Sequence, residues 1–141
     1  MGRGRHAVLL VRAGFQTFGV DINQSAIAAA RHEEPRINGW CADLTQPALP
    51  LAAFDLVVVA RYLQRDLFDA IKASVKPGGS VIYETFTTAQ LAHGAGPKSP
   101  DHLFRPGELR SFFDDWNVVF YEEVDEGEAV ARLVAQRSVS A

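Results

Sequence analysis

The feature that most constrains this chain is a pair of glycines near its start, followed at a fixed distance by an aspartate. Residues Met1–Ala7, Met-Gly-Arg-Gly-Arg-His-Ala, resemble the second half of a glycine-rich nucleotide-binding loop that runs into a helix. In nucleotide-binding α/β folds, an acidic residue that holds ribose hydroxyls lies about 20 residues after such a loop. Asp21 ends the strand-like segment Phe15–Asp21 at that place. The sequence therefore predicts a nucleotide-type ligand, with only the second half of the first binding element present.

Length and composition indicate one soluble domain over residues 1–141. Hydrophobic residues make up 48% of the chain and charged residues 22%, which is typical of globular proteins. A net charge of −3 gives no reason to expect a nucleic-acid or membrane partner. The single cysteine, Cys41, fits a reducing compartment, and no apolar run reaches the roughly 18 residues of a membrane span. Because the apolar stretch Ala7–Val11 is too short for a signal peptide, we expect a cytoplasmic protein.

The first half of the chain alternates helix-like and strand-like segments. We expect helices over residues 6–13 and 26–33, and strands over residues 15–22 and 37–42. Asn23 or Ser25 can cap the second helix. Phe54–Ala60 is an uninterrupted apolar run, which predicts a central parallel strand buried on both faces.

The second half continues this alternation and then changes character. We expect a helix from residue 65 or 66 to 75, a turn over 76–79 and a strand over 80–86. Residues 92–106 are rich in Gly, Pro and Ser and predict a long functional loop that acts as a lid. A short helix from Pro106 to near Asp114 follows. Strands over 116–124 and 129–136 are joined by the polar turn Asp125–Glu128, which predicts an antiparallel hairpin.

With this order of elements, the chain resembles class I S-adenosylmethionine-dependent methyltransferases, in particular small bacterial enzymes related to tellurite-resistance methyltransferases. The matching motifs are Gly2–Ala7, Gly19–Ile22, Ala42–Leu44, Phe54–Val57 and Lys76–Ser80. The resemblance implies an α/β, Rossmann-like doubly wound sheet, mostly parallel, with a C-terminal antiparallel hairpin and without its first strand.

The resemblance also implies S-adenosyl-L-methionine as cofactor. Glycines at the loop let the backbone approach the ligand, and a carboxylate at Asp21 accepts hydrogen bonds from the ribose diol. Asp43 would accept from the adenine amino group; the alternatives are a helix cap before Thr45 or a loop acid. Ile22 and Leu44 would enclose the adenine, although either can belong to the core. The full set of implied cofactor contacts is Gly2, Gly4, Asp21, Ile22, Ala42, Asp43, Leu44 and Ala60.

Arg61 and Tyr62 are the predicted catalytic residues, because they directly follow the strand Phe54–Ala60 at the crevice of a doubly wound sheet. They would face the transferred methyl group or an anionic acceptor; a surface arginine and a packed tyrosine are the alternative. This position lacks the Asn-Pro-Pro-aromatic signature of some nitrogen methyltransferases, which argues against base or amide methylation. Weaker candidates for acceptor contacts are Glu84, Thr85, His93 and His102, and no metal site is expected.

A sulfonium methyl group is already activated, so the protein mainly has to align a nucleophile and exclude water. We expect a small-molecule acceptor: an oxyanion, a thiol or a metabolite. A rival interpretation is a methyltransferase-like binding module without chemistry. A nicotinamide-dependent enzyme is disfavoured because Ala7 stands at the third glycine position and because the terminal hairpin is antiparallel.

The missing first strand leaves three explanations open. The recorded start can lie downstream of the true one, the chain can rearrange or pair with another copy, or the protein can be an inactive relative. Since an absent strand exposes sheet edges, we also expect homo-oligomers that form through those edges.

Overall fold

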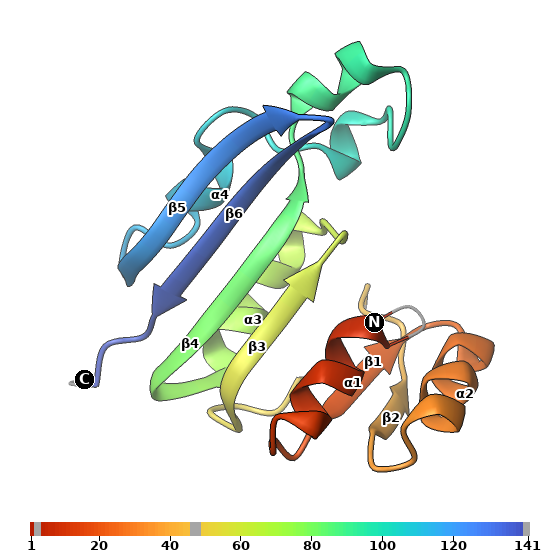
Figure 1. The fold of residues 1–141 in the computed structure, drawn as a ribbon. Helices are drawn as coiled ribbons and strands as arrows, with labels where there is room; N and C mark the ends of the chain where they lie inside the picture. The colour runs from red at the N-terminus through yellow and green to blue at the C-terminus, as the bar shows by residue number, and fades with distance from the viewer. Residues whose placement is uncertain (2–3, 46–48, 140–141) are drawn as a thin grey trace. The chain divides into compact units, whose positions relative to one another are not determined.

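The computed structural model describes residue 1 and residues 4–45 and 49–139. The chain forms two compact units, Met1–Ala48 and Leu49–Ala141, and each is described by itself. Figure 1 shows a parallel pair of strands with helices in the first unit, and a larger sheet with helices in the second.

The first unit contains the four elements expected from the sequence. They are α1 (Arg5–Arg12), β1 (Phe18–Asp21), α2 (Gln24–Glu33) and β2 (Asn38–Cys41). β1 and β2 pair in parallel, with Asp21 opposite Cys41. The strand predicted from residue 15 begins only at Phe18. The Asn23 side chain caps α2 by accepting from the Ser25 backbone N–H, which decides between the two predicted caps.

The core of the first unit is built from small and branched side chains. Ala7, Val8 and Val11 of α1 pack with Ala30 of α2 and with Ile37, and Met1 covers this cluster from outside. The small side chain of Ala30 allows a close approach of the backbone at the start of the chain. At Gly4, which has a φ of 84°, an added Cβ would lie 2.6 Å from the Ala30 Cβ. Glycine is therefore required at position 4 by both its left-handed backbone and the lack of space.

The second unit is a four-stranded sheet in the order β3-β4-β6-β5. Its strands are β3 (Phe54–Ala60), β4 (Val75–Phe86), β5 (Asn117–Glu126) and β6 (Glu128–Gln136). Its helices are η1 (Arg65–Leu67), α3 (Phe68–Ser74), η2 (Thr88–His93), η3 (Pro100–His102) and α4 (Glu108–Ser111). β3 and β4 run parallel, whereas β6 is antiparallel to both β4 and β5.

Aromatic side chains fill the core of the second unit. Figure 1 shows α3 and α4 on the same side of the sheet. Phe68 of α3 stacks on Phe112 with a centroid distance of 3.9 Å and on Tyr83 of β4 at 5.3 Å. Phe104 and Phe113 complete the cluster and are fully buried. On β6, side chains alternate between this core and the opposite, partly exposed face, as expected of a sheet with one covered face.

Four sequence predictions about the second unit need correction. β3 was expected to be central and buried on both faces, but it is the first strand in the order of its sheet and most of it is half-buried. A continuous apolar run indicates shielded side chains, but it does not determine the number of neighbouring strands. The turn expected over residues 76–79 belongs to β4, since Gly78 donates to the Arg137 carbonyl and Arg137 donates to the Gly79 carbonyl.

The long loop expected over residues 92–106 is partly helical, because it includes the end of η2 and the whole of η3. α4 is shorter than predicted and ends at Ser111 instead of near Asp114. The antiparallel hairpin is confirmed, and its turn contains Gly127 with a φ of 75°. The sequence predicted this hairpin because a polar turn that contains glycine can adopt the positive φ that joins two antiparallel strands.

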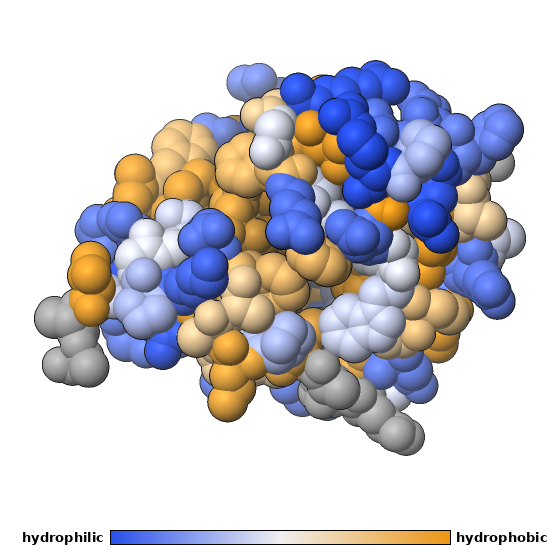
Figure 2. Space-filling view, turned by 90° about the horizontal axis from the view of Figure 1, so that it is seen from below, coloured by the Kyte–Doolittle hydropathy of each residue, from blue (hydrophilic) through white to orange (hydrophobic). Residues whose placement is uncertain are grey.

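Large hydrophobic side chains remain exposed in both units. Ile22 is 68% exposed in the first unit, and Leu51 and Val119 are 78% and 64% exposed in the second. Figure 2 shows hydrophobic residues interspersed with hydrophilic ones on the face that it views. Within the described ranges, we find no helix with the length and apolar character needed to cross a membrane.

Candidate cofactor and acceptor sites

The predicted cofactor residues of the first unit meet at the carboxyl ends of β1 and β2. The Ala42 N–H donates to the Asp21 carbonyl at 3.0 Å, and the Cys41 thiol donates to the Ile22 carbonyl at 3.4 Å. These contacts hold the residues after each strand side by side, as the parallel register requires. The structure thus brings Ala42 next to Asp21 and Ile22, although about 20 residues separate it from them in the sequence.

The Asp21 carboxylate lies beside the glycine-containing turn. Its Oδ1 accepts from the Asn23 N–H at 2.8 Å, and its Oδ2 lies 3.2 Å from the Met1 nitrogen. The Gly4 N–H in turn donates to the Met1 carbonyl at 3.2 Å. The Asp21 side chain is 19% exposed, so an oxygen acceptor at this strand end remains open to solvent. Gly2, also predicted to contact the cofactor, lies outside the described residues.

The three predicted adenine contacts differ in what surrounds them. Ile22 projects an exposed hydrophobic side chain next to Asp21, while Leu44 is half-buried. The Asp43 Oδ1 accepts from both the backbone N–H and the hydroxyl of Thr45, at 2.9 and 2.7 Å. These hydrogen bonds hold the pKa of the Asp43 carboxyl below its ordinary value. Asp43 therefore makes the capping contacts that were its alternative role, and its contact with adenine stays a prediction.

In the second unit, the residues after β3 are fixed against β4. The Arg61 N–H donates to the Glu84 carbonyl at 2.8 Å, and the Tyr83 hydroxyl donates to the Tyr62 carbonyl at 2.5 Å. Burial raises the pKa of Tyr83 well above its ordinary value, so this hydroxyl remains a donor. The Tyr62 hydroxyl donates to the side-chain oxygen of Gln64, and its side chain is partly exposed. Ala60, Arg61 and Tyr62 thus form an ordered segment at the carboxyl end of β3.

A row of alternating charges crosses the partly exposed face of this sheet. Arg132 of β6 donates to Glu84 of β4 at 2.6 Å and to Glu122 of β5 at 2.9 Å. Arg61 pairs with Glu84 at 3.4 Å and with Glu128 at 2.6 Å. Sequence reasoning named Arg61 and Glu84 but missed the other three residues. The available signal was Arg132, a charged residue inside an otherwise apolar strand.

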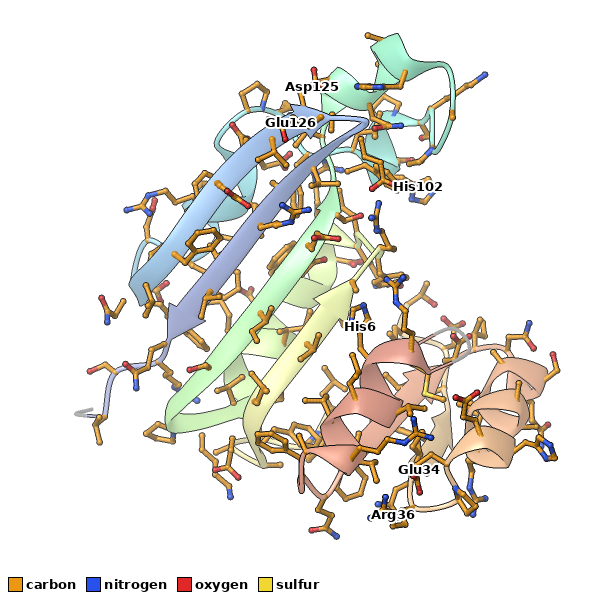
Figure 3. All side chains as sticks on the ribbon, in the orientation of Figure 1. His6, Glu34, Arg36, His102, Asp125 and Glu126 are labelled. Carbon is orange, nitrogen blue, oxygen red and sulfur yellow. The ribbon has the colours of Figure 1, made fainter. Side chains whose placement is uncertain are left out.

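Of the weaker acceptor candidates, Glu84 belongs to this row, whereas Thr85, His93 and His102 do not. Thr85 is buried, and His102 is exposed on η3. His93 contacts Asp125 at 2.5 Å, and Figure 3 places Asp125 and Glu126 near the end of the β5–β6 hairpin. A pocket of about 130 Å³ lies nearby, well below the ~300–1,000 Å³ of typical ligand pockets. Its lining residues include Thr87, Thr88, Pro106, Glu123 and Asp125.

Comparison with known proteins gives one relative and many similar structures. Hemagglutinin 1 of Eikenella corrodens is 29% identical over 140 residues, which cover 86% of this chain and 43% of that protein. The chain thus spans less than half the length of this curated relative.

Several of the similar solved structures are described as methyltransferases. An S-adenosylmethionine-dependent methyltransferase from Mesorhizobium loti has a TM-score of 0.79 at 18% identity, with 96% of this chain and 87% of that chain covered. The 1,6-didemethyltoxoflavin-N1-methyltransferase of Burkholderia thailandensis, with its acceptor and S-adenosylhomocysteine bound, has a TM-score of 0.72 at 17% identity. The alignment covers 97% of this chain and 68% of that one. These likenesses confirm the predicted α/β, Rossmann-like methyltransferase fold.

The sequence itself matches a family model described as a methyltransferase domain, over residues 1–79. This range is more than half of the 141-residue chain and includes every predicted cofactor and catalytic residue. The match confirms the predicted dependence on S-adenosyl-L-methionine at the level of the family. The chain belongs to the methyltransferase-domain family.

Proposed function

We propose that this chain transfers a methyl group from S-adenosyl-L-methionine to a small-molecule acceptor, and that Asp21 holds the cofactor's ribose. The observation that carries this proposal is the arrangement at the end of β1. A partly exposed carboxylate lies there next to the glycine-containing turn and next to the exposed Ile22 side chain. A carboxylate suits a ribose diol because it accepts two charge-assisted hydrogen bonds. An exposed apolar side chain beside it suits the face of an adenine ring.

The backbone around Gly4 fits the methionine part of the same ligand. Gly4 precedes α1 with left-handed geometry, and the first N–H groups of that eight-residue helix have no partners inside it. Such N–H groups attract a carboxylate. The bound cofactor would supply an electrophilic methyl group that needs no further activation. The chain's own task would be to hold the cofactor and to orient the acceptor.

For the acceptor side, we propose contacts from Arg61 and Tyr62. Support comes from their fixed backbone at the carboxyl end of β3 and from their partly exposed side chains. The Burkholderia enzyme, by its name, methylates 1,6-didemethyltoxoflavin, which supports a small-molecule acceptor here. The finer resemblance to tellurite-resistance methyltransferases stays a prediction, as does the missing first strand.

Calorimetric titration with S-adenosylhomocysteine tests the cofactor role. We expect Asp21→Ala to weaken binding about 100-fold, because a hydrogen bond to a charged group contributes about 1.5–3 kcal/mol. Glu33→Gln is a matched control, since it removes one exposed negative charge at the end of α2. Equal affinities of the Asp21→Ala variant and the unchanged chain would contradict the ribose assignment.

A binding module without chemistry is the second candidate. It is favoured by the Asp21 carboxylate, which already accepts a hydrogen bond from Asn23 within its own turn. The two candidates differ in turnover. A methyltransferase would convert S-adenosylmethionine to S-adenosylhomocysteine in the presence of an acceptor. A folded chain that binds neither form of the cofactor would support the module.

We also propose self-association through a sheet edge. β5 is the last strand in the order of the second unit, and Val119 and Phe120 on it are 64% and 45% exposed. Exposed apolar edge strands favour pairing with another chain. Light scattering after size-exclusion chromatography would show a dimer that Phe120→Lys converts to a monomer. A cytoplasmic location and the lack of nucleic-acid and membrane partners stay predictions.

A further inference from the structure

Arg61 has an unusual backbone for its residue type. Its φ is 58°, in the left-handed region that side chains other than glycine, asparagine and aspartate rarely adopt. The backbone is held there by the hydrogen bond from the Arg61 N–H to the Glu84 carbonyl. Left-handed residues outside glycine are a form of local strain that is often found at ligand sites. The backbone therefore directs the Arg61 side chain across the sheet toward β4 and β6.

The Arg61 guanidinium has an aromatic support and two carboxylate partners. Its central carbon lies over the Phe86 ring, 4.5 Å from the ring centroid, which is within the range of a cation–π interaction. Its Nη2 lies 3.4 Å from a Glu84 oxygen and 2.6 Å from a Glu128 oxygen. The side chain is 34% exposed, so the guanidinium is accessible from solvent.

The two carboxylates are held very differently. Glu84 is 29% exposed and is fixed by a second arginine, Arg132, at 2.6 Å. Glu128 is 53% exposed and follows Gly127 in the hairpin turn. Among the described residues, Arg61 is the single ion-pair partner of Glu128. Glu128 can therefore leave Arg61 by a side-chain rotation, while Glu84 stays in place.

We propose that Arg61 binds a carboxylate group of the methyl acceptor, and that Glu128 occupies this position until the acceptor displaces it. This inference rests on the proposed function and adds the chemical class of the acceptor: a small molecule that carries a carboxylate. Exchange of one carboxylate for another leaves the charge of the site unchanged. A planar guanidinium also matches a carboxylate with two parallel hydrogen bonds, which gives the incoming group a defined orientation.

An ammonium-bearing acceptor fits this site less well. It would need a carboxylate that stays in the site without a bound arginine, but Glu84 and Glu122 are both bound to Arg132, and Glu128 leaves the site when it releases Arg61. Release of Glu128 exposes the Arg61 cation, not an anion. The group that becomes available when Glu128 leaves is therefore the positively charged Arg61 guanidinium.

The experiment follows the side-chain Nε–H signals of the arginines by NMR while benzoate, benzylammonium or benzyl alcohol is added to the full chain. We expect benzoate alone to shift the Arg61 signal with a saturating curve. Glu128→Gln should strengthen benzoate binding about fivefold, because the internal competitor loses its charge. Glu126→Gln is the matched control, since Glu126 lies opposite Glu128 in the hairpin and lacks a contact with Arg61 among the described ion pairs. That control should change the benzoate affinity less than twofold.

Arg61→Gln should abolish the site, and assignment of the Arg132 signal in that variant verifies that the sheet is intact. Unchanged benzoate affinity in Glu128→Gln, equal effects of the two glutamate variants, or preferential binding of benzylammonium would each overturn the proposal. Titration with S-adenosylhomocysteine reports separately on the cofactor site. If the unchanged chain binds S-adenosylhomocysteine but not benzoate, this inference alone is rejected.

Discussion

The two units of this chain are built from different kinds of core. In Met1–Ala48 the buried cluster consists of alanine, valine and isoleucine, and Ala30 is fully buried against the backbone of Gly4. In Leu49–Ala141 the largest buried side chains are aromatic and lie on α3, β4 and the segments around α4. Small side chains allow a close approach of backbone segments, whereas large ones maximise buried apolar area.

This difference matches the role of each unit. In the proposed function, the first unit places a turn, a helix start and a strand end near one another to form a cofactor site. Close packing between backbone segments suits that task. The second unit carries a sheet whose partly exposed face holds the charged row of Arg61, Glu84, Glu122, Glu128 and Arg132. The first unit contains Trp40 and the second unit contains Trp116. Variants that keep only one of these tryptophans can therefore report the unfolding of each unit separately.

The largest expected effect comes from the aromatic core. Phe68 is 2% exposed and stacks between Phe112 and Tyr83. Phe68→Ala should lower the free energy of unfolding by about 3–5 kcal/mol, because it removes a buried ring and leaves a cavity. Denaturant titration followed by Trp116 fluorescence measures this loss. Phe68→Leu, which keeps most of the volume, should cost only about 1.5 kcal/mol. Equal losses in the two variants would show that the cavity is not the cause.

A smaller effect is expected from the close backbone contact of the first unit. Gly4→Ala introduces a left-handed alanine and a Cβ at 2.6 Å from the Ala30 Cβ. Strain and overpacking together should cost about 2–4 kcal/mol. Gly14 provides the matched control, because its φ is 99° and no atom lies within 4 Å of an added Cβ. Gly14→Ala should therefore cost about 1 kcal/mol, the backbone term alone. Equal losses of unfolding free energy in Gly4→Ala and Gly14→Ala, measured by Trp40 fluorescence, would contradict the packing argument.

The same contrast explains what the sequence could and could not predict. Local patterns were sufficient for α1, α2, β1, β2 and the terminal hairpin, because helix periodicity, caps and turns depend on near neighbours. The motif around Asp21 was also readable, since its spacing from the glycines is fixed by one helix and one strand.

The charged row was not predictable in the same way. Arg132 and Glu84 are 48 residues apart, and Arg61 and Glu128 are 67 apart. Their contacts depend on the strand order and on the exact register, in which Glu84 lies opposite Arg132. A shift of one residue would turn these side chains to the other face. Sequence patterns do not specify register between strands that are joined by long connections.

The smallest expected effect concerns a buried carboxylate in each unit. Glu34 is bound by Arg36, two residues away, with distances of 2.8 and 3.0 Å. Glu108 is bound by Arg65, which lies 43 residues away, at 2.7 and 3.0 Å. In both cases the hydrogen bonds to arginine hold the pKa of the carboxyl below its ordinary value, and for Glu34 the pKa falls from 4.5 to about 2. One pair is local and the other joins distant segments.

A carboxyl whose pKa is lowered by folding stabilises the folded state above its unfolded pKa and loses this contribution as the pH falls. For Glu34, the contribution should be complete above pH 4.5 and should disappear as the pH approaches 2. Glu34→Gln should therefore lower the melting temperature at pH 7, and the difference from the unchanged chain should vanish in acid. Glu33→Gln removes the same charge one residue earlier and should leave the melting temperature nearly unchanged at every pH. Glu108→Gln should lower the melting temperature more than Glu34→Gln at pH 7, because the Glu108–Arg65 pair joins segments 43 residues apart, whereas the hydrogen bonds of Glu34 are with Arg36, two residues away. If the melting temperatures of Glu34→Gln and the unchanged chain still differ by the same amount at pH 2, the cause is side-chain shape and not charge.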